Sequence, residues 1–91
     1  MIQAKVAEIL ESDQFLQEFK VSGWVRSFRS NRFIALNDGS TINNIQCVID
    51  FEKFNPETLK RITVGAAISV KGILKESEGK QQRVEIDVKE V

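Results

Sequence analysis

Residues 32–50 read RFIALNDGSTINNIQCVID, and in two short segments of this stretch two sets of side chains alternate. One of the two sets consists of Ile34, Leu36, Ile45, Cys47 and Ile49, all of them apolar. Because successive side chains of a β-strand point to opposite faces of the sheet, these positions predict two strands with one buried face. The intervening Asp38-Gly39 predicts a turn, since glycine accepts a positive φ at little cost. We therefore expect neighbouring strands at residues 32–37 and 44–51.

The same alternation places Phe33 and Gln46 on the opposite, outward face of these strands. An outward aromatic ring offers a flat surface on which a nucleic-acid base can stack. A glutamine amide both donates and accepts hydrogen bonds, which suits a uracil edge with its carbonyl oxygen beside a ring N–H. The pattern therefore predicts a site that stacks a base and reads its edge. The alternatives are a Phe33 that packs under a loop or another domain and a solvated Gln46.

The segment that carries Phe33 is locally basic. Residues 19–37 hold four basic residues and no acid, although the 91-residue chain as a whole has no net charge. Three of the four are arginines, whose planar guanidinium groups pair with phosphates or with base oxygens. These arginines are Arg26, Arg29 and Arg32, and we expect Arg32 to be a phosphate contact. A solvated surface is the alternative for any one of them taken singly.

The remaining sequence adds two helices and three strands to this pair. Residues 2–11 place apolar side chains at helical spacing, which predicts a short helix followed by a connector to residue 18. Asn55-Pro56-Glu57 combines an N-cap, a proline at the first helical position and an acid in the first turn, so it predicts a helix over 56–62. Further strands are expected at residues 19–29, 67–75 and 82–89, with a turn at Glu78-Gly79-Lys80.

Five strands with one helix between the third and the fourth is the element order of an OB-fold, a partly open Greek-key barrel. We therefore expect one all-β domain over residues 1–91, with residues 1–18 as the helix and connector and residues 19–91 as the barrel. Gly23 should mark a bend in the first strand, because glycine inside a strand often marks a bulge or a barrel corner. The ligand surface of such a barrel includes its second and third strands, where Phe33 and Gln46 are expected.

The composition argues against catalysis by this chain. There is no histidine and only one cysteine, which excludes His/Cys zinc patterns and nucleophiles activated by histidine. The carboxylate pairs Glu76/Glu78 and Glu85/Asp87 fall on strand positions that read as solvent-facing. We expect no catalytic residue, no metal site and no cofactor. No apolar run reaches membrane-spanning length, and acids stand where a signal peptide would be apolar, so we expect a cytoplasmic protein with no membrane partner.

Several motifs stand in register along the chain: Gly23-Trp24-Val25-Arg26, then Arg29, then Phe33 through Thr41, and Ile45-Gln46 leading to Asp50. Together they resemble the N-terminal anticodon-binding domain of class IIb aminoacyl-tRNA synthetases, the group of aspartyl, asparaginyl and lysyl enzymes. The segment FIALNDGST is most similar to the bacterial asparaginyl enzymes. The resemblance spans essentially the whole chain.

The resemblance implies roles for individual residues. The family's base-stacking phenylalanine falls on Phe33, its anticodon-reading glutamine on Gln46, and its strand-one arginine on Arg29. In the family these three side chains hold the central anticodon uracil. Only three residues separate Arg29 from Phe33, fewer than in many relatives, so Arg26 stays the alternative arginine at the base.

The resemblance also implies partners. They are tRNA, bound through its anticodon loop, and the enzyme's own catalytic domain, which this chain lacks and in which ATP and Mg²⁺ would act as asparagine is joined to tRNA. The parent enzyme would be a homodimer and the isolated domain a monomer. The alternatives are a stand-alone module that binds single-stranded nucleic acid, an aspartyl- or lysyl-type domain, and a barrel that binds protein.

Overall fold

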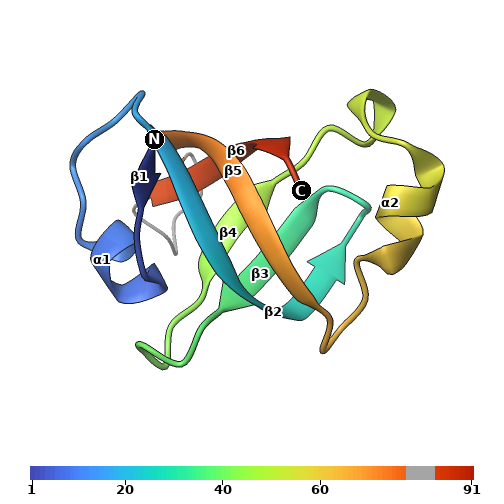
Figure 1. Ribbon diagram of the computed structural model, residues 1–91, viewed down its shortest axis with the longest axis horizontal. Coiled ribbons are helices and arrows are strands. Elements are labelled where there is room, and N and C mark those ends of the chain that lie inside the picture. Colours follow the sequence, from blue (N-terminus) through green and yellow to red (C-terminus); the bar gives the residue numbers. More distant parts are fainter. Residues whose placement is uncertain (78–83) are drawn as a thin grey trace.

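Five strands of the computed structural model, which describes residues 1–77 and 84–91, close into a barrel (Figure 1). These strands are β2 (Glu18–Arg29), β3 (Phe33–Asn37), β4 (Ile45–Val48), β5 (Ala67–Glu76) and β6 (Val84–Glu90). They lie in the order β2-β3-β4-β6-β5, and β5 pairs back onto β2. The predicted all-β OB-fold is confirmed. The predicted turn at residues 78–80 and the start of the predicted last strand at residues 82–83 lie outside the described residues.

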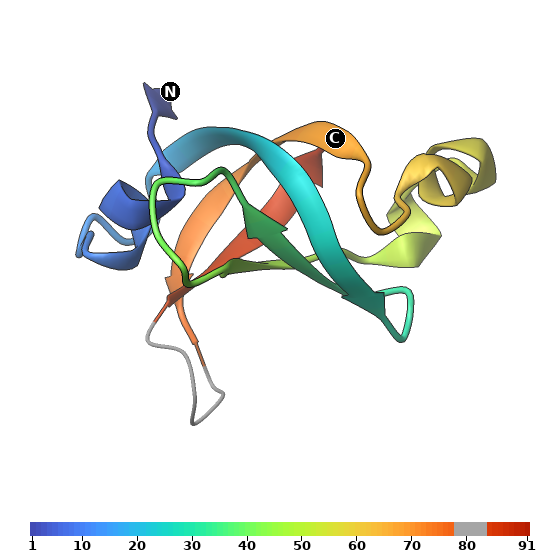
Figure 2. The same ribbon diagram turned by 90° about the horizontal axis from the view of Figure 1, so that it is seen from below.

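The barrel pairs are antiparallel except for β4 with β6, which run parallel. The chain between β4 and β5 contains a 3₁₀ helix, η1 (Phe51–Lys53), and the helix α2 (Pro56–Arg61). The Asn55 side chain caps α2 by accepting a hydrogen bond of 2.8 Å from the Glu57 N–H, as the sequence predicts. Figures 1 and 2 place α2 at one end of the barrel and α1 (Val6–Leu10) at the other.

The barrel interior holds the alternating apolar residues. The five residues predicted to face inward have no solvent exposure, which confirms the predicted register of β3 and β4; they are Ile34, Leu36, Ile45, Cys47 and Ile49. Val70, Leu74, Val84 and Ile86 are also fully buried in the core, whereas Ile68 is only partly buried against it. Burial raises the pKa of the Cys47 thiol to about 12, so this cysteine stays an unreactive thiol at neutral pH.

Strand β2 bends so that it can pair with β5 along its first half and with β3 along its second half. A Cβ atom on Gly23 would lie 2.3 Å from the carbonyl oxygen of Asn37, so only glycine permits this approach of the two strands. The register with β3 shifts between Val25 and Ser27, which leaves Arg26 as the extra residue of a bulge. The bend predicted at or just after Gly23 is therefore confirmed.

The N-terminal segment differs from the predicted helix over residues 2–11. Residues Ile2–Gln3 form β1, a parallel strand beside β2, and the helix α1 begins only at Val6. The reason is tertiary: the loop after β3 satisfies the first backbone donors of the helix. The Val6 N–H donates to Asp38 Oδ2 and the Ala7 N–H donates to Ser40 Oγ, each over 3.0 Å. Apolar spacing alone cannot reveal this capping from a distant loop.

The Asp38 carboxylate should make the free energy of unfolding depend on pH. Its partial burial works to raise its pKa, but hydrogen bonds from the Ser40 hydroxyl and the Val6 N–H outweigh burial, and the pKa lies below its ordinary value of 3.8. The stabilisation is therefore complete above about pH 4 and is lost as the pH falls through the folded-state pKa. We expect Asp38→Ala to lower the free energy of unfolding by about 0.5–2 kcal/mol at pH 7, and by less at pH 3.

Urea unfolding at both pH values measures this difference, with Asp13→Ala as the control for loss of an exposed carboxylate. An Asp38→Ala effect of equal size at pH 7 and pH 3 would show that the carboxylate charge does not stabilise α1.

Candidate nucleic-acid interface

Strand pairing arranges the outward side chains in two adjacent rows. The first row runs through Arg29, Phe33, Val48 and Asp87, which are register partners across β2, β3, β4 and β6. The second row runs through Ser27, Ala35, Gln46, Glu85 and Lys75. Phe33 and Gln46 therefore lie on neighbouring strands, one row apart, on the same outer face. Ala35, the register partner of Gln46, is the next outward residue of β3 after Phe33.

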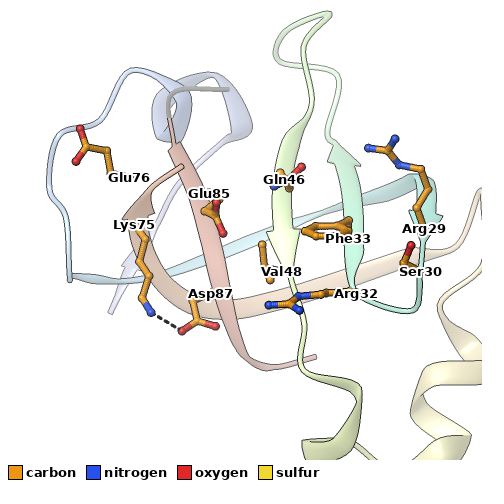
Figure 3. A pocket seen from close by; sticks show the side chains of 10 residues that line it. All are labelled: Arg29, Ser30, Arg32, Phe33, Gln46, Val48, Lys75, Glu76, Glu85 and Asp87. Atoms are coloured by element: carbon orange, nitrogen blue, oxygen red, sulfur yellow. Dashed lines mark ion pairs between the residues drawn. The ribbon is translucent and has the colours of Figure 1, made fainter. Parts of the chain in front are cut away.

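A groove of about 730 Å³ lies over these rows (Figure 3). Its lining residues are Arg29, Ser30, Arg32, Phe33, Gln46, Val48, Lys75, Glu76, Glu85 and Asp87. Phe33 and Gln46 are both half-buried, so each presents part of its side chain to the groove. A partly exposed ring beside an amide is the arrangement that base stacking and edge reading require.

The charges of the groove are divided between its two sides. Three basic and three acidic residues line it, with two arginines on the β2–β3 side and all three acids on β5 and β6. Asp87 pairs with Lys75 at 2.9 Å and with Lys89 at 3.1 Å. Partial burial opposes ionisation of Asp87, but these lysines lower its pKa, and Asp87 in turn raises the pKa of Lys75. A bound phosphate is therefore favoured on the arginine side.

The three candidate arginines occupy different places. Arg29 lies opposite Phe33 at the end of β2 and lines the groove, as does Arg32. The guanidinium carbon of Arg32 is 5.7 Å from the centre of the Phe33 ring. Arg26 is exposed on the bulge and is not among the groove residues. The geometry thus brings Arg29, and not Arg26, to the groove that Phe33 and Gln46 share.

Part of the groove was not anticipated from sequence. The sequence pattern assigns no role to Ser30, Val48 and Lys75. For the groove acids Glu76, Glu85 and Asp87 it predicts only a solvent-facing position. For the two acids on β6, alternation with Val84, Ile86 and Val88 indicated that orientation, but nothing local indicated that β6 would pair with β4. Among the described residues, no group of three or more potential ligands could hold a metal ion. Within the same residues, no helix is long and apolar enough to span a membrane.

Comparisons with known proteins agree with the fold and identify the family. An asparagine–tRNA ligase of Parabacteroides distasonis is 52% identical over 98% of this chain, which corresponds to 20% of that relative. The enzyme of the same name from Bacteroides fragilis is 45% identical over 98% of this chain and 20% of the relative. The chain therefore spans about a fifth of the length of these curated relatives.

A solved structure of Entamoeba histolytica asparaginyl-tRNA synthetase in complex with asparaginyl-adenylate has the same fold. Its TM-score is 0.76 at 22% sequence identity, and the match covers 99% of this chain and 23% of that one. A model of the tRNA anticodon family, described as an OB-fold nucleic acid binding domain, matches residues 19–91. That match covers all five barrel strands apart from the first residue of β2. The chain belongs to this family of OB-fold nucleic acid binding domains.

Proposed function

We propose that this chain is the anticodon-binding domain of a bacterial asparagine–tRNA ligase and that it reads the central uracil of the anticodon. The observation that carries the proposal is the placement of Phe33, Gln46 and Arg29 in one outward groove. The identity of 45–52% with asparagine–tRNA ligases supports it. A stand-alone binder of single-stranded nucleic acid would use the same aromatic ring, so the two functions differ in whether base identity is read.

In this proposal the base stacks on the Phe33 ring. Its edge then faces the Gln46 amide, which can donate to a carbonyl oxygen and accept from a ring N–H, the two groups that uracil presents side by side. Arg29, the register partner of Phe33, approaches from the adjacent strand and binds the base oxygen or the neighbouring phosphate. Stacking supplies affinity for any base, whereas the amide supplies the preference for uracil.

The remainder of the proposed enzyme lies outside this chain. A catalytic domain would join asparagine to the tRNA, and ATP and Mg²⁺ would bind there. We further propose that the whole enzyme is a cytoplasmic homodimer and that this domain alone is a monomer.

The proposal predicts that Gln46→Ala removes base selectivity. We expect wild type to prefer an anticodon stem-loop with a central uracil over the same stem-loop with a central cytosine. Gln46→Ala should reduce this preference by about 1 kcal/mol, since it removes the partner of one base edge and leaves the ring in place. Competition binding with the two stem-loops measures the preference. Arg29→Ala should weaken both complexes if Arg29 binds phosphate, or mainly the uracil complex if it binds the base.

A suitable control is Gln14→Ala, because Gln14 is an exposed glutamine that does not line the groove. If wild type binds both stem-loops equally, or if Gln46→Ala keeps the preference, then Gln46 does not read the base. The sequence-indifferent binder would then be the better account of this groove.

A further inference from the structure

The Arg32 side chain lies against the aromatic ring of the groove. Its guanidinium carbon is 5.7 Å from the centre of the Phe33 ring, within the range of about 6 Å over which a cation is attracted to a ring face. Figure 3 shows the two side chains extending in the same direction from the β3 end of the groove. Arg32 is therefore in contact with the group on which a base would stack.

The backbone of Arg32 is held from both sides. Its N–H donates to the Arg29 carbonyl over 3.0 Å, and its own carbonyl accepts from the Ile49 N–H over 2.8 Å. The turn before it contains Ser30 and Asn31 with φ values of 57° and 50°, which closes the hairpin tightly. The Arg32 side chain consequently starts from a fixed point directly beside Phe33.

No carboxylate of residues 1–77 or 84–91 forms an ion pair with Arg32. Asp87, the acid that lines the groove in the same row as Phe33, is already paired with Lys75 and Lys89. The guanidinium group is planar and more weakly hydrated than an ammonium group, so it stacks readily on an aromatic face. The contact with Phe33 therefore does not compete with an ion pair in this part of the chain.

Arg32 and Gln46 lie on opposite sides of the Phe33 ring (Figure 3). The register agrees, because Gln46 pairs with Ala35, one row beyond Phe33, whereas Arg32 precedes Phe33 at the hairpin end. We expect a base that uses the Gln46 amide to stack on the ring face on the Gln46 side. Arg32 then occupies the other face of the Phe33 ring, so the ring lies between Arg32 and the base.

We propose that Arg32 is a positioning residue that supports the ring of Phe33 from behind, in place of the phosphate contact that the sequence suggests. The inference rests on the proposed function, since it assigns Arg32 a part in base stacking. The guanidinium restrains the rotation of the ring, so that less side-chain freedom is lost when the base binds. Arg32 thus raises affinity for RNA without touching it.

The first test measures affinity and its salt dependence for the uracil stem-loop. Arg32→Met keeps an unbranched apolar stem and removes the guanidinium group with its charge, and we expect binding about two- to fivefold weaker. The slope of log K against log salt should match that of wild type, because no phosphate contact is lost. A phosphate contact would instead reduce the slope by roughly 0.7. Arg61→Ala, on the exposed surface of α2, is the control for loss of one distant arginine charge.

The second test repeats the substitution in a Phe33→Leu background. If Arg32 acts through the ring, Arg32→Met should cause no further loss of affinity there, because coupled residues are non-additive. Arg32→Lys should recover only part of the affinity that Arg32→Met loses, since lysine restores the charge but not the planar guanidinium group. An equal loss in both backgrounds, or a reduced salt slope, would overturn the inference and return Arg32 to phosphate binding.

A third readout needs no RNA. In the NMR spectrum of the free 91-residue chain, the Arg32 side-chain protons should be shifted upfield by the ring current and should lose this shift in Phe33→Leu. Absence of the shift would overturn the contact. If wild type binds neither stem-loop, the proposed function fails and the inference fails with it. If wild type binds and Arg32→Met binds equally well, the inference alone fails.

Discussion

Replacing Ile34 by alanine should lower the free energy of unfolding by about 2–5 kcal/mol, the usual cost of removing several buried methyl groups and leaving a cavity. Ile34 has no exposed surface, and its register partners are Phe28 and the buried Cys47, so neighbouring side chains can fill the cavity only in part. Urea unfolding followed by circular dichroism measures the change, which should appear as a lower midpoint at an unchanged m-value.

The folded fraction of Ile34→Ala should bind the uracil stem-loop as wild type does, because Ile34 faces away from the groove. Val64→Ala is a control for apolar truncation at an exposed site, where Val64 is 71% exposed. A destabilisation of Ile34→Ala no larger than that of Val64→Ala would show that β3 does not have the register described here.

Phe33→Ala, the substitution of the neighbouring residue, should weaken RNA binding and leave stability largely unchanged. We expect it to weaken binding of every stem-loop by about 1–3 kcal/mol, or about 5- to 150-fold, because it removes the stacking surface for any base. The free energy of unfolding should change far less than in Ile34→Ala, since Phe33 is only half-buried on the outer face. Fluorescence titration with labelled stem-loops of each central base measures the loss.

Phe51→Ala provides the matched control, because Phe51 is a 50% exposed phenylalanine on η1 that does not line the groove. Equal losses for Phe33→Ala and Phe51→Ala would point to a general effect of removing exposed rings. A loss confined to the uracil stem-loop would mean that Phe33 takes part in reading the base and does more than support it.

Much of the fold and of the outward face was predictable because the signals for them lie in residues that are close together in the sequence. In β3 and β4 a strict alternation specifies both the core and the outward pair of Phe33 and Gln46, because the strand period is two and one face is buried. The helix at residues 56–61 was predictable for a similar reason, since its cap and proline act within one turn.

The features that escaped prediction depend on contacts between distant segments. The start of α1 is set by Asp38 and Ser40, which lie more than thirty residues away along the chain. The acidic side of the groove depends on the parallel pairing of β4 with β6, and a parallel pair carries no hairpin signal in the sequence. Arg32 is likewise identified as a neighbour of the ring only once the hairpin geometry is known.

The parallel pair also affects the order in which the strands can pair while the protein is being synthesised. Strand β6 pairs with β4 on one side and with β5 on the other, and it is the last strand of the barrel in the sequence. During synthesis, which proceeds from the N-terminus, β4 and β5 therefore leave the ribosome before their common neighbour. Until Glu90 has emerged, both strands keep an unpaired edge that can join another chain. The groove over β3 and β4 accordingly acquires the acids of β6, Glu85 and Asp87, only at the end of translation of this domain.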